Sequence, residues 1–301
     1  NQFNRTVSAN LGMSYSICNV LAESGIENVA RWVPYAMDEK ELTNRISNKM
    51  IRPTTIPQSI EALKIEQAIA REALRLSFKQ HKEFAVNLKG VQQERTISDA
   101  FEQTSSGETL VDMLDLDLLV GSGGVLSHAP RREQAMRMLV DSFLPEGITR
   151  IAVDSIFMMP QLGVLSTVHE KAAVEVFEKD CLIYLGTCVA PVGKFKENQI
   201  VLEYEINLSD EKVTGEIKEG EMILIKTGMN DCSAVFRPGK GLNIGVGENE
   251  ILSTKIDGGE VGILLDGRGR RPFCIPEQTS IRIEKLLDWS SKTNEYPRGK
   301  K

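Results

Sequence analysis

A short glycine-rich segment follows an apolar run in the middle of the chain. Residues 116–120 are apolar apart from Asp117, residues 121–124 read Gly-Ser-Gly-Gly, and His128 follows. Glycine lets the backbone approach a ligand closely and adopt a positive φ. The pattern predicts a buried strand, a tight turn and then a helix that begins at Pro130. The N–H groups at the N-terminus of that helix, and its dipole, would favour an anion or a sugar near the turn. The candidate ligand-binding residues are therefore Gly121, Ser122, Gly123, Gly124 and His128.

The common phosphate-binding motifs do not describe this segment. It lacks the Gly-Lys-Ser/Thr end of a P-loop, and Leu126 stands where a dinucleotide fingerprint requires its third glycine. The alternative interpretation is structural, namely a tight turn that allows close helix–sheet packing. For His128, a hydrogen bond at the helix entry is the structural alternative to contact with a ribose or phosphate.

Two further groups of charged residues are candidate sites. Asp154 follows a strand-like run at residues 150–153, where a carboxylate is more often a cap or turn residue than a functional one. Arg268, Arg270 and Arg271 alternate with glycines. They indicate either a solvated hairpin tip or a contact with a partner protein or a phosphate, since arginine forks suit phosphate and carboxylate.

Metal and disulfide chemistry are not indicated. The chain has five cysteines without a CxxC pair and three histidines without metal-ligand spacing. We expect reduced thiols that pack as small apolar groups, no metal ligands and no catalytic residue in this chain. The residues are Cys18, Cys181, Cys188, Cys232, Cys274, His81, His128 and His169.

Composition excludes several classes of protein. The 301 residues are 41% hydrophobic and 26% charged, as in globular proteins. A net charge of −6 argues against general capture of nucleic acid or of an anionic membrane. There is no apolar run of ~18 residues and no signal-like N-terminus, so we expect a cytoplasmic protein.

Local patterns divide the chain into a helix-rich and a glycine-rich part. Helices are expected at residues 14–24, from an N-cap at Asp38, and from Pro57 to about residue 82, with residues 92–108 as a surface loop. After a boundary at residues 190–193, antiparallel strands are expected at residues 200–207, 221–226, 241–246 and 261–266. The predicted units are residues 1–193, a β-rich barrel or sandwich over 194–289, and a flexible tail over 290–301.

The strand, glycine turn and helix resemble the adenosine motif of the actin/Hsp70/sugar-kinase superfamily. Within it the chain resembles the GlmL (also called MutL) accessory proteins of adenosylcobalamin-dependent mutases and aminomutases, which are unrelated to the mismatch-repair protein of that name. The segments that carry this resemblance are residues 5–7 with 11–13, the long helix around 68–77, residues 121–128, Asp154 with 160–165, and residues 259–270.

The resemblance implies an α/β actin-like (ribonuclease H-like) ATPase lobe, here its second lobe at residues 1–193, followed by a smaller mainly-β domain. It implies ATP or ADP with Mg²⁺ as cofactor, a mutase or aminomutase as partner, and a reactivating chaperone that releases damaged cobalamin. Gly121, Ser122, Gly123, Gly124 and His128 would contact the nucleoside.

The chain departs from the family pattern in two places. Residues 8–10 read Ser-Ala-Asn where an acidic, glycine-containing segment is expected in relatives associated with glutamate mutase, so an ornithine or lysine aminomutase is the favoured partner. Neither Asp-x-Gly-x-Thr phosphate motif is found, so we expect a C-terminal portion of a longer protein, with the Mg²⁺ ligands outside it and no useful ATP hydrolysis by this chain alone. The alternatives are a small-molecule kinase on the same scaffold and a scaffold subunit that binds a partner but no nucleotide.

Overall fold

The computed structural model describes residues 9–85, 110–209, 211–228, 231–270 and 275–296. Its centre is a mixed five-stranded sheet in the order β1-β2-β3-β11-β7. The strands are β1 (Leu118–Gly121), β2 (Gly147–Asp154), β3 (Leu182–Ala190), β11 (Gly262–Asp266) and β7 (Met222–Ile225). β1 runs parallel to β2 and β3 parallel to β11, while the other two pairs are antiparallel.

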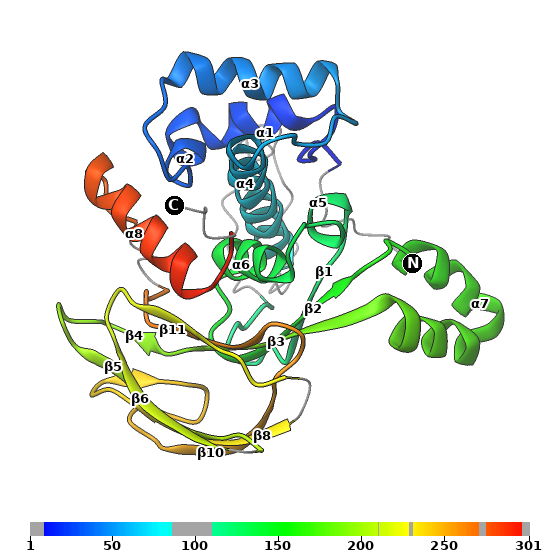
Figure 1. Ribbon diagram of the computed structural model, residues 1–301. Helices are drawn as coiled ribbons and strands as arrows, with labels where there is room; N and C mark the ends of the chain where they lie inside the picture. The colour runs from blue at the N-terminus through cyan, green and yellow to red at the C-terminus, as the bar shows by residue number, and fades with distance from the viewer. Residues whose placement is uncertain (1–8, 86–109, 210, 229–230, 271–274, 297–301) are drawn as a thin grey trace, which may run out of the picture.

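A second, four-stranded antiparallel sheet packs beneath the first (Figure 1). Its order is β10 (Leu252–Asp257), β8 (Asp231–Pro238), β5 (Ile200–Asn207) and β6 (Lys212–Lys218). Side chains alternate along β11: Ile263 and Leu265 join the core between the two sheets, and Leu264 joins the core under the helices. The expected antiparallel strands are therefore present, as a sandwich, whereas β11 is parallel to β3.

The five-stranded sheet crosses the expected boundary at residues 190–193. β7 and β11 come from the glycine-rich part but pair in one sheet with strands of the helix-rich part. At the boundary, the two-residue strand β4 (Val192–Gly193) pairs with the two-residue strand β9 (Leu242–Asn243) in antiparallel orientation. The predicted strand at residues 241–246 is thus limited to two residues, because Gly241 and Gly245 have φ values of 79° and 108° that break an extended run. The architecture is an α/β part followed by a β-rich part.

Helices cover the other face of the central sheet (Figure 1). α6 (Arg132–Phe143) lies on the sheet and α4 (Ile60–Phe84) lies on α6. Above them are α1 (Ile17–Ser24), α2 (Ile26–Ala30) and α3 (Glu39–Ile51). The Asp38 carboxylate accepts a hydrogen bond from the Glu41 N–H and caps α3, as predicted. The expected start of the long helix at Pro57 was wrong, because Ser59 provides the cap by accepting from the Ala62 N–H. Residues 92–108 lie outside the described residues.

Residues 279–296 pack against the body of the protein. α8 (Thr279–Lys292) contacts β7, Trp289 is buried, and Glu295 is 4% exposed. The expected flexible tail from residue 290 is therefore ordered as far as Tyr296, because Glu295 forms ion pairs with Arg71 and Arg137 in the interior.

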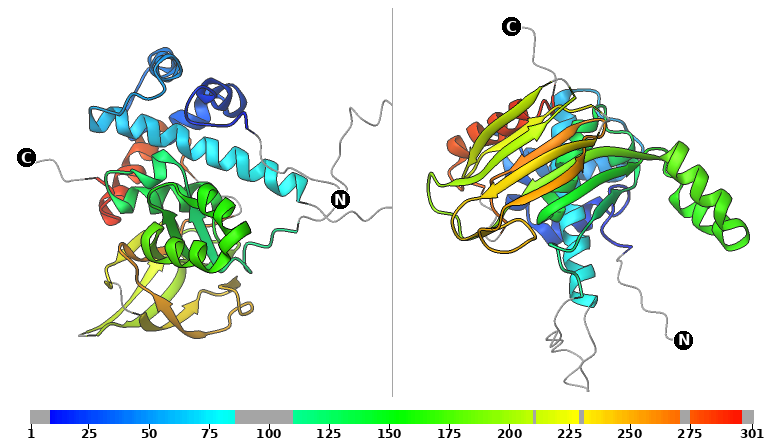
Figure 2. Two further views of the ribbon diagram at one scale, coloured as in Figure 1. Left: turned by 90° about the vertical axis from the view of Figure 1, so that its right-hand side faces the viewer. Right: turned by 90° about the horizontal axis from the view of Figure 1, so that it is seen from below.

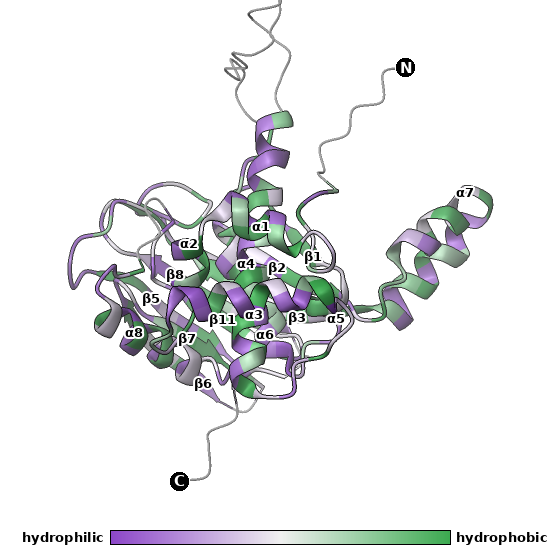
Figure 3. Ribbon diagram, turned by 90° about the horizontal axis from the view of Figure 1, so that it is seen from above, coloured by the Kyte–Doolittle hydropathy of each residue, from purple (hydrophilic) through white to green (hydrophobic). Residues whose placement is uncertain are grey.

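One helical hairpin projects from the body (Figures 1 and 2). α7 (Met159–Val176) leaves the end of β2, continues into a π-helical turn (Phe177–Cys181) and returns into β3. Several apolar side chains on this arm are exposed, including Val164 and Val168. Figure 3 shows the arm standing clear of the other elements, with hydrophobic residues along it.

Candidate functional site

The glycine turn lies between β1 and a short helix. β1 ends at Gly121, Gly123 adopts a φ of 107°, and α5 (Gly124–Ser127) begins at once. The predicted strand and turn are present, and so is the helix expected after Pro130, although Pro130 precedes its N-cap and is not its first residue. The long helix α6 begins at Arg132, with Arg131 as its N-cap. Because α5 has only four residues, the strong helix dipole expected beside the turn is missing.

The glycines of the turn have different environments. A Cβ built on Gly121 would lie 2.9 Å from the methyl groups of Leu139, so this glycine allows α6 to pack against the strand. A Cβ on Gly123 or Gly124 would meet nothing within 4 Å. The backbone at residues 123–124 therefore faces open space, which is the condition for close approach of a ligand.

This open space is a cavity of about 270 Å³, here called the turn cavity. The glycine turn forms one wall, and small or apolar residues of α4 form another. Ala70, Ala73, Leu74 and Ser77 recur at helical spacing on the α4 face that lines it. The remaining lining residues are Leu11, Met13, Ser14, Ser122, Gly123, Gly124, Val125 and Leu126.

A larger cavity of about 840 Å³ adjoins the turn cavity, and we call it the His128 cavity. The two share Met13, Ser14, Gly124 and Val125. His128 is exposed and lines only the larger one, together with Lys49 and Arg131 among others. The structure thus separates His128 from Ser122 and Gly123, which line only the turn cavity.

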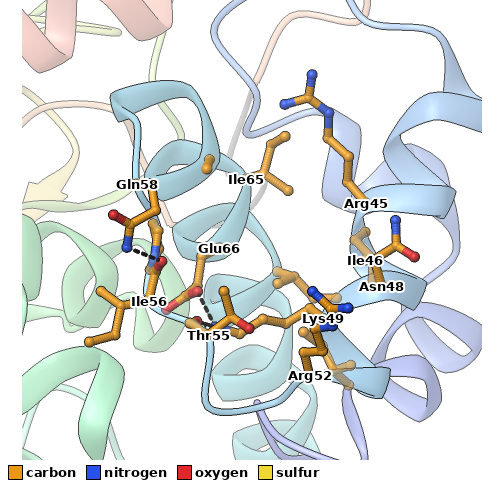
Figure 4. Close-up of a pocket in the computed structure, with 14 residues that line it drawn as sticks. Arg45, Ile46, Asn48, Lys49, Arg52, Thr55, Ile56, Gln58, Ile65 and Glu66 are labelled. Carbon is orange, nitrogen blue, oxygen red and sulfur yellow. Dashed lines mark hydrogen bonds and ion pairs between the residues drawn. The ribbon is translucent and has the colours of Figure 1, made fainter.

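A third cavity, of about 420 Å³, lies between α3 and α4 (Figure 4). Its floor is apolar, with Ile46 and Ile65, and its rim carries Arg45, Lys49 and Glu66. The Lys49 ammonium lies 2.7 Å from the Glu66 carboxylate, and both residues also line the His128 cavity. Arg45 forms ion pairs with Glu41 and Glu61.

Asp154 connects the turn to the projecting arm. Its Oδ2 accepts hydrogen bonds from the Ser122 hydroxyl at 3.2 Å and the Met159 N–H at 2.9 Å, and its Oδ1 accepts from the Met158 N–H at 3.1 Å. Burial raises the pKa of Asp154, but these hydrogen bonds outweigh it and leave the pKa below its usual value. The predicted cap role is confirmed. The contact with Ser122 was not foreseen, because nothing local in the sequence links residues 122 and 154.

The arginines after β11 are not at a solvated hairpin tip, so that expectation was wrong. Arg268 and Arg270 are buried. Arg268 lies 2.8 Å from both Asp141 and Asp266, and Arg270 lies 3.0 Å from Asp266. Buried carboxylates of α6 and β11 therefore neutralise these guanidinium groups, which are not available to a partner or a phosphate. Arg271 lies outside the described residues.

No metal centre is formed by the described residues: they contain no group of three or more His, Cys, Asp or Glu side chains placed to hold an ion. Cys18, Cys181 and Cys188 are free thiols, and Cys181, Cys188 and Cys232 are buried. Burial raises the pKa of Cys188 to about 12, so it is protonated at neutral pH. Cys274 lies outside the described residues. In the same part of the chain, no helix is long and apolar enough to cross a membrane.

Comparison with known proteins identifies the family. A family model described as "MutL protein" matches residues 1–181, which is more than half of the 301 residues. The chain belongs to the MutL protein family. The MutL match contains every residue that lines the turn cavity, but it ends before β3. No curated protein and no solved structure matches the chain.

The α4 wall of the turn cavity was missed by sequence reasoning. The sequence of this helix predicts only a core element. A signal was present, because small residues at positions 70, 73 and 77 interrupt the larger apolar residues on one face. The sequence of a helix does not say which other segment packs against a given face of it. The small residues alone therefore did not indicate a cavity.

Proposed function

We propose that this protein is an ATP-dependent reactivating factor for an adenosylcobalamin-dependent mutase or aminomutase, and that this chain supplies the adenosine half of the nucleotide site. Membership of the MutL family is compatible with an accessory role beside a mutase. The observation that carries the nucleotide part is the turn cavity: a bare backbone at Gly123 and Gly124 faces a helix whose small side chains leave room for a ligand.

The chemistry of the lining fits a nucleoside and not the metal-bound phosphates. Among the described residues that line the turn cavity there is no carboxylate for Mg²⁺ and no base for an attacking water. In this proposal, ATP with its Mg²⁺ lies in a cleft whose second wall belongs to an actin-like partner lobe, and this chain alone binds nucleotide without hydrolysing it. The same lining gives no support to a kinase, which needs a catalytic carboxylate.

Nucleotide occupancy would act on the mutase by changing the shape of the protein. A ligand shifts such an equilibrium only through different affinities for the two shapes. Ser122, on the turn, is hydrogen-bonded to Asp154, which caps α7. Occupancy of the turn cavity therefore has a direct route to the projecting arm, the element that stands clear of the body.

The test uses a glycine substitution with a matched control. Gly124→Val adds a side chain at a position that lines both the turn cavity and the His128 cavity, where a Cβ meets no atom within 4 Å. We expect it to weaken ATP binding in calorimetry at least tenfold. Gly163→Val makes the same change at another open helical position, on α7, and should leave ATP binding unchanged. Equal ATP affinity in both variants contradicts the site.

The partner is tested by capture from a cell extract that contains the mutase or aminomutase. The wild-type protein should retain the enzyme in an ATP-sensitive manner, and Gly124→Val should lose that sensitivity. If ATP and ADP do not change how much enzyme is captured, and calorimetry detects no nucleotide binding, the result would favour a scaffold subunit that binds a partner but no nucleotide.

A further inference from the structure

We infer that the cavity between α3 and α4 (Figure 4) is a second binding site, for a small molecule with an apolar body and a single carboxylate. We call it the α3–α4 cavity. It shares no lining residue with the turn cavity: its lining residues on α4 lie between positions 62 and 69, and those of the turn cavity lie between positions 70 and 77. The inference therefore goes beyond the proposed function and does not depend on nucleotide binding.

The floor of the α3–α4 cavity is apolar. Ile17 of α1, Ile46 of α3, and Ile65 and Ile69 of α4 line it, and each of these side chains is buried. Ile56, in the loop between α3 and α4, also lines the cavity and is 72% exposed. The volume of about 420 Å³ lies within the ~300–1,000 Å³ that is usual for small-molecule sites. An apolar group bound here would leave water for contact with these side chains, which is favourable.

Two of the three cations among the described lining residues are neutralised within the protein. The Arg45 guanidinium lies 2.6 Å from the Glu41 carboxylate and 3.2 Å from the Glu61 carboxylate. The Lys49 ammonium lies 2.7 Å from Glu66. Recruiting either cation to a ligand would therefore break an existing ion pair.

Arg52 is the third cation that lines the cavity. It is the C-cap of α3 and is exposed, and its guanidinium forms no ion pair or hydrogen bond with the described residues. Asn48 lines the cavity four positions earlier on α3, and its side-chain amide is likewise unpartnered within that part of the chain. A guanidinium fork binds one carboxylate through two parallel hydrogen bonds, and the amide can donate a further one. The cavity thus offers a place for one negative charge beside an apolar floor.

The same lining disfavours ligands of other charge. A cationic ligand would meet the Arg52 guanidinium. A second negative charge would approach the Glu66 carboxylate, and no further unpaired cation stands among the described lining residues to compensate it. An uncharged ligand would gain the apolar contact alone. The chemistry that fits all of these groups is an apolar body with one carboxylate, as in a medium-chain carboxylic acid.

Isothermal titration calorimetry of this chain in the absence of nucleotide tests the ligand class. Octanoate, 1-octanol and octylamine have the same apolar chain and differ in charge. We expect saturable one-to-one binding of octanoate, about three- to fivefold tighter than that of octanol, as for an exposed ion pair, and octylamine should bind most weakly. Hexanoate should bind about 15-fold more weakly than octanoate, because each buried methylene contributes about fourfold.

Two of the possible results overturn the inference directly. They are the absence of saturable octanoate binding, and equal affinities for octanoate and octanol. Because these titrations contain no nucleotide, neither result bears on the proposed function.

Two variants with matched controls place the ligand in the α3–α4 cavity. Arg52→Ala should weaken octanoate about three- to fivefold and leave octanol unchanged. Arg237→Ala, at an exposed position on β8, is its control and should change neither. Ala62→Leu adds bulk to the lining and should weaken octanoate and octanol alike by about tenfold or more, because it fills space that the ligand needs. Its control is Ala172→Leu, half-buried on α7, which should change neither.

An unchanged octanoate affinity in Arg52→Ala, or in Ala62→Leu, overturns the placement of the ligand. Arg52 is exposed, so its substitution does not disturb the core, and it decides the matter without the Ala62 variant.

Discussion

Asp141 and Asp266 hold four guanidinium groups in the interior. Asp141 accepts from Arg71, Arg137 and Arg268, and Asp266 pairs with Arg268 and Arg270. Burial raises the pKa of each carboxyl, but the surrounding arginines outweigh burial and hold both pKa values far below the usual range. The cluster joins α6 to the end of β11, so single side chains here connect distant parts of the chain.

The first prediction concerns this cluster and acid. A carboxyl whose folded-state pKa is depressed contributes stability that is complete above its unfolded pKa, near ~4, and is lost as pH falls below it. Asp141→Asn leaves buried arginines without a counter-charge and should reduce the free energy of unfolding by about 3–5 kcal/mol at neutral pH. The stability of this variant should also fall less steeply than that of the wild type below pH ~4.

Urea unfolding followed by circular dichroism between pH 2 and 7 measures both effects. Glu203→Gln, an exposed position on β5, is the control and should behave like the wild type. Wild-type stability in Asp141→Asn at neutral pH would contradict the role given to the cluster.

At the scale of helices and strands, the sequence patterns that involve only neighbouring residues predicted the structure reliably. The cap at Asp38 and the strand at residues 200–207 are where the sequence predicts them, because capping and alternation involve neighbouring residues. The helix after Pro130 is also where the sequence predicts it, whereas the short helix α5 between the glycine turn and Pro130 was not foreseen. The glycine turn of the candidate site was predictable for the same reason, because it is one short segment of the sequence. The α4 wall was not predictable, because α4 meets this segment only in the folded structure.

The second prediction concerns the cap of α7. Asp154→Ala removes the acceptor for the Met158 and Met159 N–H groups and should cost about 1 kcal/mol, most of it locally. We expect amide hydrogen exchange in the first turns of α7 to become several-fold faster, while exchange in the central sheet stays slow. Glu170→Ala, exposed further along α7, is the control. Unchanged exchange at the start of α7 would show that the cap does not hold the arm.

At the scale of the whole molecule, the last described residues close the structure. Glu295 lies 2.8 Å from Arg71 of α4 and also pairs with Arg137 of α6, and the Tyr296 hydroxyl donates to Gln67. Burial and the neighbouring Glu295 raise the pKa of Tyr296 well above its usual value, so the hydroxyl remains a donor at physiological pH. Residues more than 200 positions apart are thereby joined.

The third prediction follows from this closure. Deletion of residues 291–301 should lower the melting temperature by several degrees, because it leaves Arg137 and Arg71 with one carboxylate fewer in a buried setting. Glu284→Gln, at an exposed position on α8, is the control and should leave the melting temperature unchanged. Differential scanning calorimetry of the two variants decides the matter, and equal melting temperatures would contradict the prediction.

By itself the sequence determined local pieces: the strand and bare turn around Gly123, the cap at Asp38, the strand at residues 200–207 and the absence of common phosphate motifs. The tertiary structure alone decided which pieces meet. It buried Arg268 against Asp141, 127 positions away, placed β7 and β11 in the central sheet, and separated His128 from the turn cavity. The physical reason is that propensity, capping and turn chemistry depend on neighbours within about one helical turn, whereas pairing of buried charges and strands depends on contacts that chain folding brings together.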